Sequence, residues 1–213
     1  MDKVKILSNL EIAPDIYSLT FRKLFDFIPG QVVKITTHTA IAPRMYSIAS
    51  GNNEPEIQII YDIKPEGELT NVLKSLKVHD EVFISPPFGQ FTCNEKVAWW
   101  IATGTGIAPF YSMIKSERKL GIMLLHGVRN PETLLFKDEF HSLMNDHYIP
   151  CCSGKKIEGV YFGRVTEYLR QMDKIQTGVK YYLCGSAEMV VNVRDILIEK
   201  GVAFGDIVSE IYF

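Results

Sequence analysis

Hydrophobic and polar positions follow one rule in the first half of the chain and another in the second. In the first 95 residues, six short runs with alternating character are rich in Ile, Val, Tyr, Phe and Thr, as strands are. These runs are 4–10, 17–22, 31–37, 45–49, 57–61 and 81–85. Turn residues such as Pro29-Gly30 separate them, and no crossover helix intervenes. This half therefore predicts an antiparallel β-barrel.

One segment of the first half has helical spacing instead. Apolar residues recur at the spacing of one helix face after Gly67, which predicts a short helix that starts near Thr70. A glycine and a hydroxyl at a helix start are suited to bind an anion. A plain helix cap is the alternative interpretation of Thr70.

In the second half, strands alternate with helices. Strands are expected at 97–102, 122–128, 148–152, 181–184 and 207–213, and helices from 109 and over 135–143, 165–172 and 187–200. This alternation predicts an α/β domain with a doubly wound parallel sheet. We place the domain boundary within 91–96, which gives a barrel domain of residues 1–94 and an α/β domain of residues 95–213.

A glycine turn joins the first strand and the first helix of this second half. Its sequence is Ala-Thr-Gly-Thr-Gly-Ile-Ala-Pro over residues 102–109. Two glycines beside a helix start are suited to the binding of a nucleotide phosphate, whereas a flexible βα connection is the alternative. Pro109 stands where the dinucleotide fingerprint has its third glycine, and proline is tolerated in the first turn of a helix. Other candidate residues also end strands, at 127–129, at Ser153 and at 184–185.

Composition narrows the function classes. The 213 residues have a formal net charge of -2, which implies no bulk attraction to nucleic acid or to an anionic membrane. The four cysteines lack zinc or iron–sulfur spacing, so free thiols and no metal are expected. We expect no membrane span and a cytoplasmic location. His126 lies in an apolar strand and is interpreted as a core residue.

Taken together, these motifs resemble the ferredoxin–NADP+ reductase family along nearly the whole chain. The first are Arg44-Met45-Tyr46-Ser47 on a strand and Gly67-Glu68-Leu69-Thr70 at a helix start. The glycine turn and the pair Cys184-Gly185 follow in the same order as in the family. Further matches are Ile28-Pro29-Gly30-Gln31, Pro87-Phe88-Gly89-Gln90-Phe91 and the ending Glu210-Ile211-Tyr212-Phe213.

The resemblance implies roles for the first group of residues. Arg44 would pair with the flavin pyrophosphate, and the segment Gly67, Glu68, Leu69 and Thr70 would hold the same group, a motif that goes with FAD. Tyr46 would stack on the flavin ring, and Ser47 would hydrogen-bond near the flavin N5. Met45, between them, is also counted as a cofactor-binding residue. An ion pair for Arg44 and a barrel position for Tyr46 are the alternatives.

The resemblance also implies a nicotinamide site. Thr103, Gly104, Thr105, Gly106 and Pro109 would bind the nucleotide. Cys184, with Gly185 leaving room, would pack near the hydride-carrying carbon, and Glu210 would lie near the same site. Tyr212 or Phe213 would cover the flavin.

Four cations and one serine bear on the choice of nucleotide: Arg129, Ser153, Lys155, Lys156 and Arg164. Related NADP enzymes often have Ser-Arg where this chain has Ser153-Gly154. The cations favour NADP(H), with NAD(H) possible, and a solvated basic surface is the alternative.

The implied activity is hydride transfer between NAD(P)H and FAD, followed by single-electron transfer to ferredoxin or flavodoxin. A free-flavin reductase or the reductase component of an oxygenase system is one alternative. A non-catalytic flavin-binding module is another.

Overall fold

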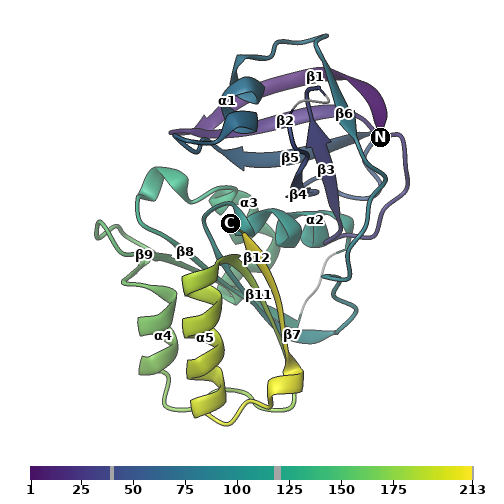
Figure 1. Ribbon diagram of the computed structural model, residues 1–213. Helices are drawn as coiled ribbons and strands as arrows, with labels where there is room; N and C mark the ends of the chain where they lie inside the picture. Colours follow the sequence, from purple (N-terminus) through teal and green to yellow (C-terminus); the bar gives the residue numbers. More distant parts are fainter. Residues whose placement is uncertain (39–40, 118–120, 213) are drawn as a thin grey trace. The chain divides into compact units, whose positions relative to one another are not determined.

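The computed structural model of the chain describes residues 1–38, 41–117 and 121–212. Their packing divides them into two compact units, and Figure 1 follows the chain through both. The first unit contains Met1–Cys93 and Ala108–Glu117. The second contains Asn94–Ile107 and the described residues that follow Glu117.

The first unit is an antiparallel β-barrel, as predicted. Its strands are β1 (Asp2–Ala13), β2 (Ile16–Arg22), β3 (Val32–Thr36), β4 (Arg44–Ser47), β5 (Glu56–Asp62) and β6 (Glu81–Ile84). They lie in the order β4-β3-β6-β1-β2-β5. An antiparallel bridge between Ile48 and Ile59 joins the two ends of this order. Closure removes the open edges that an antiparallel sheet would otherwise expose.

The barrel interior is filled by the apolar side chains of the alternating runs. Phe21, Ile35 and Ile59 are among its fully buried residues. The helix α1 (Glu68–Ser75) also belongs to this core, because Leu69 and Leu73 on one of its faces are buried in it. The helix begins two residues before the expected start at Thr70, with Gly67 as its N-cap residue.

The second unit contains a parallel sheet, also as predicted. Its strands are β7 (Val97–Thr103), β8 (Gly121–Val128), β9 (Tyr148–Cys152), β10 (Tyr161–Phe162), β11 (Lys180–Ser186) and β12 (Ile207–Tyr212). Their order is β10-β9-β8-β7-β11-β12. The order reverses between β7 and β11, and ligands of such sheets bind outside the carboxyl ends of the strands at this switch point.

Helices of the second unit lie close to the expected positions. They are α3 (Lys137–Met144), α4 (Val165–Gln171) and α5 (Ala187–Glu199). Short 3-10 turns cover Gly104–Ile107, Pro131–Thr133, Asn145–His147 and Phe204–Asp206. Figure 1 shows α4 and α5 side by side, and their apolar faces share a buried cluster with Trp99, Leu125 and Leu183 of the sheet. No described helix has the length and apolar character that crossing a membrane requires.

Helix α2 (Ala108–Ser116) follows β7 in the chain and packs in the first unit. Every residue from Ala108 to Ile114 is buried, so the helix has no broad solvent face over this stretch. In the sequence, an amphipathic run leads out of the glycine turn from Phe110 to Lys119, and its last two residues lie outside the described part of the chain.

Candidate functional site

Strand β4 carries the first group of candidate residues, and burial increases along it. Arg44 and Met45 are exposed, Tyr46 is half-buried and Ser47 is buried. Burial along this four-residue strand therefore does not alternate between two faces. Among the described residues Arg44 has no ion-pair partner, so its guanidinium is available to a ligand.

Tyr46 presents a neutral ring that its surroundings hold in place. Burial raises the pKa of its phenol well above the usual range, and the charge of Asp62 adds to this effect while Arg44 opposes it. Its ring meets that of Tyr61 edge-on, with centroids 6.4 Å apart. A fixed, uncharged aromatic face is suited to stack on a planar ligand.

The start of α1 provides backbone donors rather than side chains. Gly67 places no side-chain acceptor on the first-turn N–H groups, so these remain available to an anion. Thr70 lies within the first turn and donates its hydroxyl to the Gly67 carbonyl at 3.5 Å. Glu68 is exposed, whereas the side chain of Leu69 is buried in the barrel core. Only the backbone of Leu69 can therefore meet a ligand.

Two glycines of the turn after β7 have different tasks. Gly106 packs against β11, since a Cβ added to it would lie 2.4 Å from the Cys184 carbonyl oxygen. Gly104 has φ +55° and nothing within 4 Å of an added Cβ, so it borders open space. Thr103 and Thr105 flank this open position and are half-buried. The turn thus has one wall fixed to the sheet and one side free for a phosphate.

Cys184 and Gly185 lie at the switch point of the sheet. Strand β12 pairs with β11 so that Glu210 lies opposite Cys184. Burial raises the pKa of the Cys184 thiol well above its usual range, Glu210 adds to this effect, and a hydrogen bond with Tyr212 opposes it. The thiol is therefore protonated at neutral pH. Cys184, Glu210 and Tyr212 form one cluster, while Phe213 lies outside the described residues.

The candidate cations come from the carboxyl ends of β8, β9 and β10. Gly154 donates its N–H to the Arg129 carbonyl at 2.9 Å, and Ser153 donates its N–H to the Val128 carbonyl at 3.0 Å. Lys155 and Lys156 are exposed in the same loop. Arg164 lies before α4, where its guanidinium is 3.9 Å from the carboxylate of Glu188. The structure thus places all four cations near neighbouring strand ends.

Pro109 is the second residue of α2, so it lies in the first turn of a helix as expected, and it is buried. Sequence reasoning missed β10, because a strand of two residues is too short to show periodicity. This strand carries the exposed Phe162 opposite Cys152, next to the candidate Ser153.

The residues present fit a flavin nucleotide on the first unit and a nicotinamide nucleotide on the second. Arg44 and the uncapped start of α1 provide two sets of anion donors, and Tyr46 provides an aromatic ring. The open position at Gly104 lies at the switch point, where nucleotides bind in doubly wound sheets.

Comparison with known proteins agrees with this assignment. The family model described as oxidoreductase FAD-binding domain matches residues 3–93, and the one described as oxidoreductase NAD-binding domain matches residues 100–195. The electron transfer component of toluate 1,2-dioxygenase from Pseudomonas putida is 29% identical, over 95% of this chain and 63% of its own length. The flavodoxin/ferredoxin–NADP reductase of Buchnera aphidicola is also 29% identical, over 81% of this chain and 79% of its own.

A solved structure shows the same fold over the full chain. The ferredoxin NADP+ reductase from Neisseria gonorrhoeae, with bound FAD and NADP, superposes with a TM-score of 0.91 at 20% identity. The match covers 100% of this chain and 98% of that one. By contrast, the chain spans less than two thirds of the length of the toluate dioxygenase component.

The chain thus matches an oxidoreductase FAD-binding domain followed by an oxidoreductase NAD-binding domain. The chain belongs to the ferredoxin–NADP+ reductase-like family.

Proposed function

We propose that this chain is an FAD-dependent NAD(P)H reductase that passes single electrons to a small redox protein of the ferredoxin or flavodoxin kind. The observation that carries the proposal is the cluster at the switch point of the second sheet. There, an open glycine position lies at the end of β7, and Cys184 on the adjacent strand has Glu210 and Tyr212 as neighbours. A protein that only bound a flavin would not need this cluster in its second unit.

Residues of the first unit would bind and orient the flavin. Arg44 would pair with the pyrophosphate together with the N–H groups at the start of α1. Tyr46 would hold the ring by stacking, and the buried Ser47 at the end of β4 would hydrogen-bond to it. FAD, when bound, accepts two electrons from a nicotinamide and releases them one at a time.

Residues of the second unit would hold the nicotinamide nucleotide. The backbone of Thr103–Gly106 would receive its pyrophosphate at the open side of Gly104. The uncharged Cys184 thiol would contact the reacting ring by packing against it. Glu210 would stabilise that positive charge.

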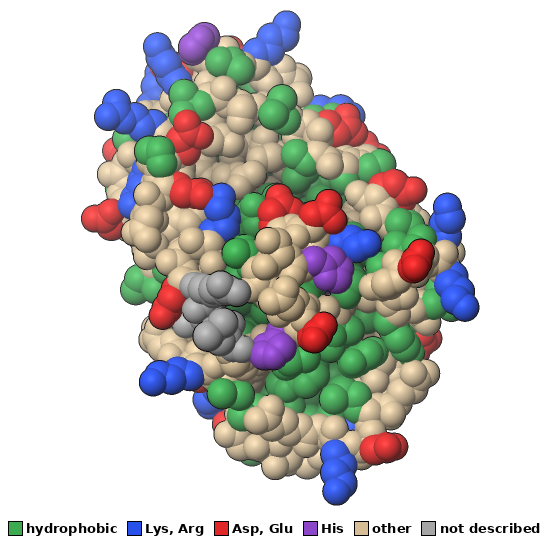
Figure 2. All heavy atoms as spheres, turned by 180° about the vertical axis from the view of Figure 1, so that it is seen from behind, with side chains coloured by type: hydrophobic (Ala, Val, Ile, Leu, Met, Phe, Trp, Pro, Cys, Tyr) green, Lys and Arg blue, Asp and Glu red, His purple; other side chains and the backbone are tan. Residues whose placement is uncertain are grey.

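We also propose a preference for NADPH over NADH. Arg129, Lys155, Lys156 and Arg164 lie at neighbouring strand ends, where a 2′-phosphate would gain charge-assisted hydrogen bonds. Basic and acidic side chains are otherwise interspersed over the face that Figure 2 shows.

A reductase component of an oxygenase system is the second candidate. It is favoured by the likeness to the toluate dioxygenase component, which extends over 95% of this chain. Both candidates share the FAD and NAD(P)H steps and differ only in the electron acceptor. Parallel assays with ferredoxin, flavodoxin, free flavin and an oxygenase ferredoxin would separate them.

The FAD and NAD(P)H steps that both candidates share can be tested by the absorbance of the flavin. Purified protein should be yellow with bound FAD, and anaerobic NADPH should bleach the flavin band. Protein that neither retains nor regains FAD, or whose FAD is not reduced by either nucleotide, would refute the proposal. Equal bleaching rates with NADPH and NADH would remove only the proposed preference.

A further inference from the structure

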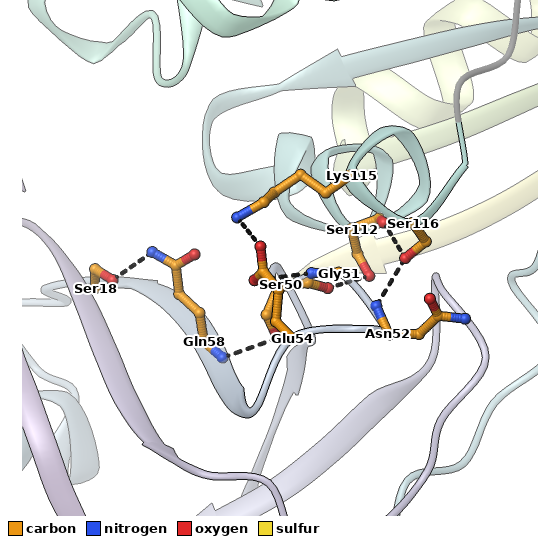
Figure 3. A network of polar contacts seen from close by, with 9 residues as sticks. All are labelled: Ser18, Ser50, Gly51, Asn52, Glu54, Gln58, Ser112, Lys115 and Ser116. Carbon is orange, nitrogen blue, oxygen red and sulfur yellow. Dashed lines mark hydrogen bonds and ion pairs between the residues drawn. The ribbon is translucent and has the colours of Figure 1, made fainter.

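Helix α2 is attached to the first unit by a set of polar contacts that the proposed chemistry does not use. Ser112 is fully buried and donates its hydroxyl to the Ser50 carbonyl at 2.7 Å. One turn later, the hydroxyl of Ser116 accepts the Asn52 N–H at 2.8 Å and donates to the Ser112 carbonyl at 2.7 Å. Figure 3 shows both serines pointing from the helix toward the same loop.

An ion pair and a backbone approach complete the attachment. Lys115 pairs with Glu54, which also accepts the Gly51 N–H at 3.2 Å. A Cβ added to Gly51 would lie 3.3 Å from both the Cβ and the carbonyl oxygen of Lys115. The loop Ser50–Glu54 therefore lies directly against the last turns of the helix.

A second set of α2 contacts is apolar. It involves Gly30 and Phe91, two residues of the family motifs to which no cofactor role was assigned. Gly30 has φ +98°, and an added Cβ would lie 2.0 Å from the Phe91 carbonyl oxygen and 2.6 Å from the Met113 methyl carbon. The rings of Phe91 and Phe110 meet edge-on at 5.6 Å. The Pro29-Gly30 turn and Phe91 thus form a surface on which the helix packs.

The attachment of α2 to loop Ser50–Glu54 matters because each of them directly follows a candidate site segment in the chain. Helix α2 begins at the residue that follows Gly104–Ile107, and Ser50 comes three residues after Ser47. A short covalent path from the nucleotide turn and another from the flavin strand therefore meet at the hydrogen bond between Ser112 and Ser50. Apolar packing alone tolerates small sliding, whereas buried directional hydrogen bonds specify one arrangement.

We propose that Ser112 and Ser116 are positioning residues for hydride transfer: by fixing α2 on loop Ser50–Glu54, they anchor the segment that directly follows the nucleotide turn. This inference rests on the proposed reductase function. Misplacement of reacting groups by 1 Å is enough to slow a reaction about 100-fold, so a small movement of α2 matters.

The test compares Ser112→Ala with Ser18→Ala. Ser18 is buried in the same network and accepts the Gln58 side-chain N–H at 2.7 Å, but it does not touch α2 (Figure 3). Both variants remove one hydroxyl hydrogen bond from the first unit. Stopped-flow flavin bleaching at saturating NADPH gives the rate of hydride transfer, and its concentration dependence gives nucleotide affinity.

We expect Ser112→Ala to slow flavin reduction about tenfold, with FAD content unchanged and nucleotide affinity altered less than about twofold. Ser18→Ala should lower thermal stability and leave the reduction rate unchanged. Ser116→Ala should slow reduction by a smaller factor, and it serves as the test variant if Ser112→Ala does not fold. Equal rates in the serine variants of α2 and in Ser18→Ala would overturn the proposal.

Amide hydrogen exchange provides a readout that needs no turnover. Exchange of the 104–108 amides should quicken in Ser112→Ala and stay at the wild-type rate in Ser18→Ala. Unchanged exchange at these amides would also overturn the proposal. If wild-type flavin is not reduced at all, the reductase function fails, and the exchange result still decides whether α2 positions the turn.

Discussion

The two units build their candidate sites in different ways. In the barrel, the residues follow one another along β4, which presents side chains, and at the start of α1, which presents backbone N–H groups. In the parallel sheet, the candidates come from the ends of β7, β8, β9, β10, β11 and β12, which are far apart in sequence. The first kind of site is local in sequence, and the second depends on how closely distant backbone segments approach.

This difference shows most clearly in the turn after β7. Gly106 is required there by the approach of the turn to β11, whereas Gly104 borders open space. A motif of two glycines thus combines a folding requirement with a binding requirement. Substitutions can separate the two.

The largest effect is expected for Gly106→Ala. Its Cβ would overlap the backbone of a central strand, so we expect the second unit to lose about 3 kcal/mol of stability. Both tryptophans of the chain lie in β7, so tryptophan emission during urea unfolding reports on this unit alone.

Gly104→Ala is the matched control in the same turn. Its cost should be about 1 kcal/mol, from a positive φ in a residue with a Cβ. Nucleotide affinity should nevertheless fall, because the methyl group would occupy the open side. A stability loss as large as that of Gly106→Ala would mean that both glycines serve folding only.

Much of this architecture could be predicted from the sequence, for identifiable reasons. The barrel strands alternate apolar and polar residues, whereas the parallel strands are continuous apolar runs. The two kinds of sheet could therefore be told apart by their hydrophobic patterns. His126 stood in such a run, and its complete burial confirms the core interpretation. Strand β10 was missed because two residues carry no period.

The limits of prediction are also physical. Helix α2 follows a strand of the second unit, and its apolar residues give no sign of which surface covers them. Ser112 is a lone hydroxyl in that helix, and only the fold brings it to the Ser50 carbonyl. Arg44 and Gly104 could be found because charge and backbone freedom leave a local pattern, whereas a packing partner does not.

The units should also differ in their response to acid. Burial lowers the pKa of His126 to about 3, and its Nδ1 lies 3.1 Å from the hydroxyl of Tyr148, whose own pKa burial raises. The unfolded chain takes up this proton near pH 6.5 and the folded chain does not. Stability therefore falls as pH decreases from about 6.5 toward 3, by about 2 kcal/mol between pH 7 and 5.

Tryptophan emission in urea at both pH values measures this loss in the second unit. His126→Asn keeps a polar partner for Tyr148 without a titrating ring, so its stability should change much less between the two values. In the first unit, His38 and His79 are exposed, and FAD release should show little change over the same range. An equal acid response in the variant would exclude His126 as the cause.

The smallest expected effect on stability comes from removing one tyrosine hydroxyl. It can be compared between the two units, because each has a tyrosine that donates the same kind of hydrogen bond. In the first unit Tyr61 donates to the Asn9 amide oxygen at 2.9 Å, and in the second Tyr161 donates to the Gln171 amide oxygen at 2.9 Å. Asn9 in turn donates to the Leu73 carbonyl at the end of α1, so the first bond supports a candidate site element.

Tyr61→Phe should cost about 1 kcal/mol because it leaves a part-buried amide oxygen without its donor. Tyr161→Phe should cost less than about 0.5 kcal/mol, since water replaces the exposed bond. Flavin fluorescence on heating measures the first loss, and tryptophan emission measures the second. Because the ring of Tyr61 remains against Tyr46, FAD should stay bound in Tyr61→Phe at ordinary temperature. Loss of FAD there would mean that the hydroxyl, through Asn9 and α1, maintains the flavin site itself.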